Sequence, residues 1–307
     1  METGESMKKL KILRLSYEKR KQINGYFFLL PWIIGVSLFF IKPLIQSIIF
    51  SFEKITIGET GLIEKFVQTE NYYYMLFKDP NFTQNLINTS VKLLQNTPII
   101  IFFSLFIAII LNQKFKGRAI ARVFFFLPVI ITSGVVMELV GNQIFSVNTS
   151  AVVQDMPLMQ STVLRDMLLN SGLPISIVQT LTGFIDQIFS LTWRSGIQII
   201  LFLSGLQSIP KMYYEASSVE GASAWDSFWK ITIPLLSPIM FMTLIFTIID
   251  GFTDYTNIIL RSIFSSALND FQYGLSSAQA CMYFIVILVF IALAYLIFGR
   301  KTFYMVD

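Results

Sequence analysis

The stretch YYEASSVEGASAWDSFWKITIPLLSP, residues 213–238, decides the fold because it is a polar interval between two long apolar runs. Its charged side chains are Glu215, Glu220, Asp226 and Lys230, and Gly221 divides it in two. Each flanking run has about 20 residues, the length that a helix needs to cross the hydrocarbon core of a bilayer. The stretch is therefore predicted to be a water-facing loop between two membrane helices.

The composition is typical of a membrane protein. Of the 307 residues, 54% are hydrophobic and 14% are charged, whereas soluble domains carry about 25% charged residues. The chain has no His, which excludes a catalytic His and a His-ligated metal site. The single Cys281 lies in an apolar run and excludes a disulfide framework. The net charge of +4 reflects basic residues beside apolar spans, so topology explains it better than a nucleic-acid partner does.

Six apolar spans follow one another along the chain, so the predicted fold class is an all-α membrane protein of six transmembrane helices. The spans are residues 26–52, 88–111, 123–145, 184–206, 231–253 and 276–298. The first span follows a basic tail, residues 1–25, and is too long to be a cleaved secretory signal. Residues 53–87 are predicted to be an extracytoplasmic loop with one short amphipathic helix, and residues 146–183 a loop or surface segment.

The distribution of Lys and Arg indicates the orientation in the membrane. Six spans place both termini on one side, and that side carries fifteen Lys and Arg residues against five on the other. Because positive charge accumulates in cytoplasmic segments, both termini are predicted to be cytoplasmic. Residues 88–299 then form a five-helix core with a cytoplasmic loop at 211–234, and residues 300–307 form a cytoplasmic tail.

Helical spacing organises the first half of the loop. Tyr213, Ala216, Val219 and Glu220 fall along one side of a short helix, which Gly221 can end in a left-handed conformation. A second segment, residues 222–230, leads into the fifth span, which has two Pro residues in its opening turns. Small residues allow such a helix to enter a partner's groove closely, and its carboxylates can meet basic groups there.

The spacing Glu-Ala-x, three residues, Gly, nine residues, Ile-x-x-Pro resembles the EAA loop of permease subunits in ATP-binding-cassette (ABC) importers. The motif positions are Glu215, Ala216, Gly221, Ile231 and Pro234. Ser217 replaces the second Ala of the motif, and Ile233 replaces the Leu before the Pro. The flanking sequences GLQSIPKMYYEA and WDSFWKITIPLLSP resemble binding-protein-dependent sugar permeases of the maltose and multiple-sugar type.

The resemblance extends to residues 29–52, 70–94 and 271–295. Among the residues that carry it are Ser51, Phe52, Asn71, Tyr72, Tyr273, Gly274 and Ala278. Two places depart from the family pattern. A Gly-Gly-Pro sequence is absent near residues 256–266, and residues 146–183 match no segment of the family.

The resemblance implies a type I importer half in a bacterial or archaeal cytoplasmic membrane. A second six-helix permease, two cytoplasmic ATPases and an extracytoplasmic sugar-binding protein would be its partners. The chain has no GxxxxGK[ST] phosphate loop, so ATP and Mg²⁺ would belong to the ATPases, and this subunit would be a transporter part and not an enzyme. The resemblance implies that this subunit couples to the ATPase through Tyr214, Glu215, Ala216, Val219, Glu220, Gly221, Ile231 and Pro234.

Polar side chains within the spans are candidates for a substrate pathway, because such groups usually face a bundle interior or a wet cavity. They are Glu138 and Asn142; Trp193, Arg194 and Gln198; and Asp250, Asp254 and Asn257. The last three form an i, i+4, i+7 stripe on a helix. The alternative is structural: Arg194 neutralises Asp250 or Glu138, Trp193 and Tyr255 anchor the interface, and Asp254 and Asn257 are merely solvated at the outer rim.

Two other classes of protein remain as alternatives. An ion-coupled secondary transporter or channel would use an intramembrane carboxylate near the bilayer midplane, and Glu138 or Asp250 could serve. That alternative does not explain the Glu215–Pro234 spacing. A membrane enzyme would need a nucleophile with a base, or a metal site, and the sequence offers neither pattern.

Overall fold

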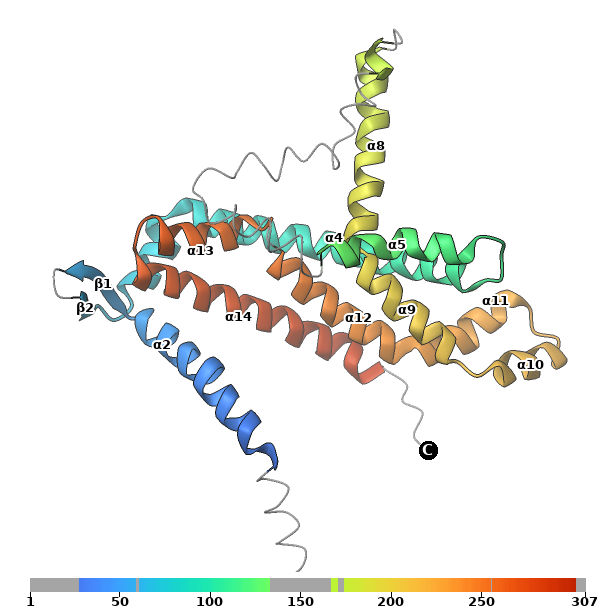
Figure 1. The fold of residues 1–307 in the computed structure, drawn as a ribbon, viewed down its shortest axis with the longest axis horizontal. Coiled ribbons are helices and arrows are strands. Elements are labelled where there is room, and N and C mark those ends of the chain that lie inside the picture. The colour runs from blue at the N-terminus through green and yellow to red at the C-terminus, as the bar shows by residue number, and fades with distance from the viewer. Residues whose placement is uncertain (1–27, 59–60, 133–166, 171–173, 255, 302–307) are drawn as a thin grey trace, which may run out of the picture. The chain divides into compact units, whose positions relative to one another are not determined.

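The structure, a computed structural model, describes residues 28–58, 61–132, 167–170, 174–254 and 256–301 (Figure 1). Helices dominate it. The chain divides into two compact units, one made of Met1–Thr83 and Arg261–Tyr283, the other of Gln84–Leu260 and Phe284–Asp307. Each unit is described by itself.

The first unit begins with helical residues Phe28–Phe50, 23 residues that include η1 (Ser37–Ile41) and α2 (Lys42–Phe50). Pro43 cannot donate to the carbonyl four residues earlier, and the turn before it widens into the π-helix η1, in which Lys42 N donates to Ser37 O. Most of the apolar side chains along this helix are exposed, as expected where a helix faces lipid. The predicted first span is therefore a long apolar helix.

A two-stranded antiparallel hairpin follows, made of β1 (Glu53–Gly58) and β2 (Gly61–Phe66). The chain is mostly helical as predicted, but this hairpin departs from the all-α class and from the loop with one short helix that was predicted at 53–87. The β-branched run Ile55, Thr56 and Ile57 favours a strand, and glycines flank the turn on both sides. Beyond the hairpin lie two short helices, α3 (Glu70–Tyr73) and η2 (Tyr74–Lys78).

Residues that are far apart in the sequence meet around Asn71. The Asn71 side chain donates to Ser51 O at 3.0 Å and to Glu53 O at 2.9 Å, so it fastens α3 to the start of β1. The Tyr72 hydroxyl donates to Ser51 Oγ at 2.8 Å, and burial raises the Tyr72 pKa above its ordinary value, which keeps this hydroxyl protonated as a donor. The side chains of Asn71 and Tyr72 thus join α3 to the end of α2 and to the start of β1.

Gly274 completes this junction from the start of α14 (Tyr273–Phe298). A Cβ placed on Gly274 would overlap the carbonyl oxygen of Glu53 and would lie 3.2 Å from Asn71 Nδ2. Only glycine therefore allows the helix to approach β1 this closely. Some of the residues that carry the family resemblance outside the loop meet at this junction, namely Ser51, Phe52, Asn71, Tyr72 and Gly274.

Helix α4 (Pro80–Asn112) runs from the first unit into the second. Its 33 residues give it a length of about 50 Å, more than a hydrocarbon core of about 30 Å requires. It begins eight residues before the predicted second span. Helix α5 (Arg118–Thr132) covers the start of the predicted third span, and residues 133–145 of that span lie outside the described residues.

The predicted fourth span is two helices, α8 (Ile175–Arg194) and α9 (Gly196–Ser208), bent by 59° at Ser195. The bend lies within the predicted span 184–206, at a Ser-Gly pair, which is a common site of helix kinks. The prediction of a loop at 146–183 fails for residues 167–170 and 175–183, which are helical.

The 211–238 region contains α10 (Lys211–Val219), α11 (Ala224–Ser227) and η3 (Phe228–Thr232), and it leads into α12 (Ile233–Thr253). Helix α13 (Ile258–Leu268), α14 and the short η4 (Gly299–Lys301) end the described chain. Four described helices are long and apolar enough to cross a membrane, or five if α8 and α9 together count as one span.

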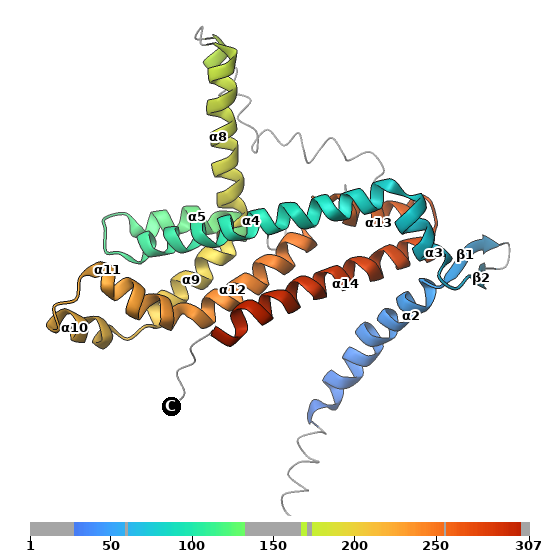
Figure 2. The same cartoon turned by 180° about the vertical axis from the view of Figure 1, so that it is seen from behind.

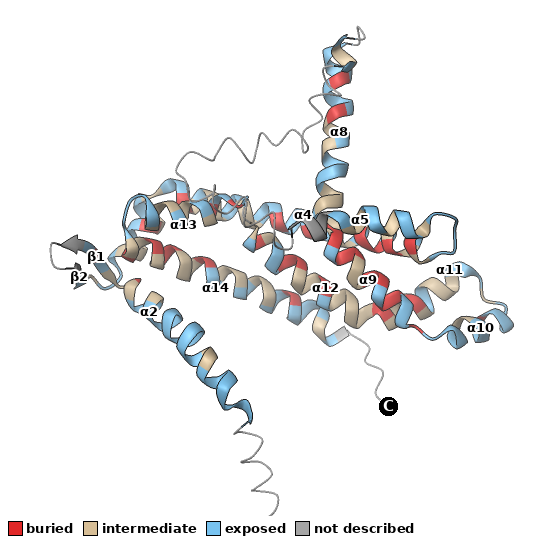
Figure 3. Cartoon of the chain, viewed as in Figure 1, coloured by how far each residue is buried: buried red, intermediate tan, exposed pale blue. Residues whose placement is uncertain are grey.

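The core of the second unit joins α4, α9 and α12 (Figure 3). Its buried members are Leu105, Ala108, Leu111, Ile199, Phe202, Leu203, Leu206 and Leu236. Gly205 lets α9 approach α12, since a Cβ there would lie 2.7 Å from Leu236 Cδ1. Figures 1 and 2 show α9 and α12 together from opposite sides. The two helices that the 211–232 segment connects are thus packed against each other.

Candidate functional site

The 211–232 segment folds back on itself as a compact element. Ser217 is buried, and its hydroxyl lies 3.1 Å from that of Ser227 in α11. The Tyr214 hydroxyl lies 2.9 Å from Thr232 Oγ1, in the last residue before α12. These two contacts hold α10 against the helical segment that enters the membrane helix, so the two halves of the loop can move as one body.

Gly221 ends α10 as predicted. Its φ of +78° is left-handed, and Ala222 N donates to Ser217 O at 3.0 Å while Gly221 N donates to Ser218 O at 3.1 Å. This pair of bonds is the Schellman arrangement, which satisfies the last carbonyls of a helix and reverses the chain. The glycine therefore sets the angle between α10 and α11.

A capping box begins α11. Asp226 N donates to Ser223 Oγ at 3.2 Å, and Ser223 N donates to an Asp226 carboxylate oxygen at 3.3 Å. The bond from the Ser223 hydroxyl, and then Lys230 at 3.2 Å, hold the pKa of Asp226 below its ordinary value. A lowered carboxyl pKa contributes stability above the unfolded-state pKa and loses it only as the pH falls through the folded value. The box is therefore intact at neutral pH.

The exposed face of α10 is acidic and apolar. Glu215, Ala216 and Glu220 are exposed, and Val219 has 88% of its surface exposed. The Val219 side chain is therefore not stabilised by burial in this chain's own core. The face is therefore available to another protein, while the opposite side of α10 is occupied by the Ser217 and Tyr214 contacts.

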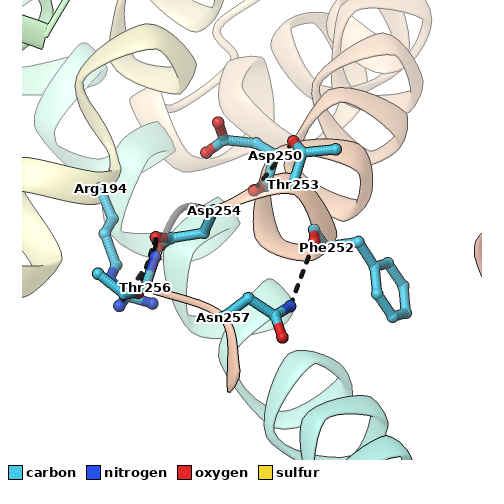
Figure 4. A network of polar contacts seen from close by, with 7 residues as sticks. All are labelled: Arg194, Asp250, Phe252, Thr253, Asp254, Thr256 and Asn257. Atoms are coloured by element: carbon cyan, nitrogen blue, oxygen red, sulfur yellow. Dashed lines mark hydrogen bonds and ion pairs between the residues drawn. The ribbon is translucent and has the colours of Figure 1, made fainter. Parts of the chain in front are cut away.

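A second site lies in a cavity of about 230 Å³ in the second unit. Arg194, the last residue of α8, places Nη2 3.5 Å from Asp254 Oδ2 (Figure 4). Asp254 Oδ1 accepts from Thr256 N at 2.8 Å and from Thr256 Oγ1 at 2.7 Å. The lining is completed by Asn257, by residues at the end of α12 and by one face of α4.

Sequence comparison places both sites within one family. The model of the family described as "Binding-protein-dependent transport system inner membrane component" matches residues 74–301, which include the loop and the cavity. The chain belongs to this family. It is therefore a component of a transport system in a membrane, in agreement with the expectation of a transport subunit and not an enzyme.

The relatives of this transport component are named as permeases. It is 32% identical to the probable ABC transporter permease protein YesP of Bacillus subtilis (strain 168), over 99% of this chain and 96% of that protein. It is 31% identical to the multiple sugar-binding transport system permease protein MsmF of Streptococcus mutans, over 87% of this chain and 93% of that protein. These alignments span nearly the full length of both relatives.

The fold of the transport component is also that of a chain in a solved ABC transporter. A crystal structure of a bacterial alginate ABC transporter, in complex with an alginate pentasaccharide-bound periplasmic protein, aligns with a TM-score of 0.63. The alignment covers 94% of this chain and 98% of that one, at 20% identity. At this identity the likeness concerns the fold alone.

The structure divides the predicted loop residues of this transport component into two groups. Tyr214 contacts Thr232 within the chain, so it holds the loop together. Ile231 and Pro234 are partly buried at the entry to α12, where they belong to the joint and not to the exposed face. Glu215, Ala216, Val219 and Glu220 keep the exposure that the prediction required.

The structure also corrects the predicted pathway. Helix α12 ends at Thr253, and Asp254 has an extended ψ of 127°, so the i, i+4, i+7 stripe of Asp250, Asp254 and Asn257 does not exist as a helical stripe. Asp254 and Asn257 nevertheless both line the cavity. Arg194 forms its ion pair with Asp254, and not with Asp250 as the structural alternative had it.

The remaining predicted pathway residues are placed elsewhere. Trp193 contacts Phe189 in α8, with ring centroids 5.8 Å apart. Gln198 is buried in α9 beyond the bend, where it interacts with Asp250. Glu138, Asn142 and Tyr255 lie outside the described residues.

Sequence reasoning missed the contribution of α4. Thr89, Lys92 and Asn96 line the cavity together with Arg194. The signal was available, because Lys92 is a full charge inside the predicted second span, where ionisable residues usually mark a function.

Proposed function

We propose that this chain is a transmembrane subunit of an ATP-driven importer of sugars or oligosaccharides, that it forms half of the pathway, and that it couples to a cytoplasmic ATPase through the 211–234 loop. The observation that carries the proposal is the folded loop, whose α10 is fixed on one side and exposes Glu215 and Val219 on the other. The sugar class is supported by relatives named for multiple sugars, lactose and trehalose/maltose.

The structure supports a route by which force on the loop reaches the cavity. Displacement of α10 would be transmitted to η3 through the contact between Tyr214 and Thr232. Helix η3 continues directly into α12. Helix α12 packs against α9 at Gly205 and ends next to Asp254, which lines the cavity. Because packed helices move as rigid elements, displacement of the loop would shift one wall of the cavity against α4.

The rest of the assembly is proposed on the same basis. The chain would have six spans with both termini in the cytoplasm of a bacterial or archaeal cell. It would pair with a second six-helix permease, and two ATPases would bind ATP and Mg²⁺. An extracytoplasmic binding protein would deliver the sugar to a pathway that includes Glu138, Asn142, Trp193, Arg194, Gln198, Asp250, Asp254 and Asn257.

Reconstitution of the purified complex into proteoliposomes tests this proposal. Uptake of the sugar delivered by the binding protein is expected only with ATP on the side of the ATPases, and it should stop when the ATPases are omitted. An imposed H⁺ or Na⁺ gradient should not replace ATP. If this chain moved sugar by itself under an ion gradient, it would be the ion-coupled transporter of the alternative interpretation.

A further inference from the structure

One face of α4 supplies the cavity with polar groups that no predicted site contains. Thr89, Lys92 and Asn96 are spaced i, i+3 and i+7, so they follow one stripe of the helix. All three line the cavity that Arg194 and Asp254 close on the other side. The stripe is therefore part of the wall that a ligand would meet.

The other polar groups of the cavity already have partners within the protein. Both carboxylate oxygens of Asp254 are engaged, one by Thr256 and the other by Arg194. The Asn257 side chain donates to Phe252 O at 3.2 Å and accepts from Ile259 N at 3.0 Å. The hydroxyls of Thr97 and Thr247 donate to backbone carbonyls of their own helices.

The polar group of the cavity that is left to interact with a ligand most strongly is the positively charged Lys92. In the described part of the chain, no carboxylate lies within ion-pair distance of Lys92. Lys92 is exposed on the face of α4 that lines the cavity, and its ammonium group has three donors and no acceptor. Lys92 and Arg194 against Asp254 give the cavity lining a net charge of +1.

We propose that this cavity binds an acidic saccharide, one that carries a carboxylate, and that Lys92 receives that carboxylate. This inference rests on the proposed sugar-import function and narrows its substrate class. A neutral sugar offers no opposite charge to the Lys92 ammonium and would find the Asp254 oxygens already engaged. A uronate supplies the missing negative charge through charge-assisted hydrogen bonds, while Thr89 and Asn96 can bond to neighbouring hydroxyls.

The volume of the cavity agrees with a ligand of this size. At about 230 Å³ it is smaller than the pockets of about 300 Å³ or more that hold drug-sized ligands. It therefore suits one sugar unit of a chain at a time. Lys92 is placed to select that unit by its charge.

Calorimetric titration of the purified importer complex with digalacturonate and with galactobiose of the same linkage tests the inference, since the two probes differ only at the carboxylates. Digalacturonate is expected to bind about tenfold or more tightly, because hydrogen bonds to charged groups are worth more than neutral ones. Lys92→Met should abolish the preference, and Lys92→Arg, which keeps the charge, should retain most of it.

Equal binding of the two probes, or an unchanged preference in Lys92→Met, would overturn the inference. Because the titration needs no ATP, its failure is distinguishable from failure of the proposed function. If the inference alone is wrong, ATP-driven uptake of a neutral sugar persists in proteoliposomes and is unaffected by Lys92→Met. If the proposed function is wrong, neither probe binds and no ATP-driven uptake occurs with any sugar.

Discussion

Replacement of Glu215 by Lys is expected to reduce ATP-driven uptake more than tenfold while the chain still inserts into the membrane. Glu215 lies on the exposed face of α10, and in the described structure it forms no ion pair within the chain. We therefore expect its charge to contribute to contact with a partner and not to the fold. Loss of one member of a buried charge pair at an interface costs about 2 to 5 kcal/mol, and reversal adds repulsion between like charges.

The measurement compares uptake, ATPase activity and co-purified ATPase between wild type and Glu215→Lys at equal amounts of inserted permease. Glu64→Lys is the matched control, because Glu64 is also an exposed carboxylate and lies on the β1–β2 hairpin. It should change none of the three quantities. Normal uptake and normal ATPase association in Glu215→Lys would show that α10 does not couple to an ATPase.

Replacement of Gly274 by Ala is expected to destabilise the fold by about 3 kcal/mol, the upper part of the usual range for overpacking. The new Cβ would overlap the carbonyl oxygen of Glu53. That oxygen belongs to the backbone and accepts from Asn71, so it cannot move aside as the end of a flexible side chain would. The start of α14 must shift instead, and the Asn71 bonds that join α3 to β1 weaken with it.

Thermal unfolding of the purified chain in detergent measures this effect. Gly183→Ala is the matched control, since Gly183 lies inside α8 and a Cβ there meets nothing within 4 Å. Alanine is a better helix former than glycine by about 1 kcal/mol, so the control should be unchanged or slightly more stable. If Gly274→Ala unfolded at the wild-type temperature, the close approach at Glu53 would not be a constraint.

The sequence allowed prediction of those parts of the loop that local chemistry determines. Gly221 was expected to end a helix because glycine adopts the left-handed backbone conformation at little cost. Its φ is +78°. The apolar runs likewise marked the long helices, since length and hydropathy alone require them. The exposure of Glu215 and Val219 followed from the helical spacing of small and charged residues around them.

The features that the sequence did not reveal depend on tertiary contacts. The β1–β2 hairpin was hidden because six-residue strands carry a weak signal beside long apolar helices. The bend at Ser195 lies within a continuous apolar pattern. The end of α12 at Thr253 separates Asp254 from Asp250, and helical counting could not foresee it. The place of Lys92 in a cavity could not be foreseen, because Arg194 and Asp254, which line the cavity with it, are distant in the sequence.

The central claim is that α10 is a cytoplasmic surface that receives force from a separate ATPase. Glu215→Cys tests it directly in a chain whose single native cysteine, Cys281, is replaced by Ala. A bifunctional thiol reagent at position 215 is expected to cross-link the chain to an ATPase subunit, and an impermeant thiol reagent outside intact cells should not reach that position. Labelling from outside, with no cross-link to an ATPase, would contradict the account.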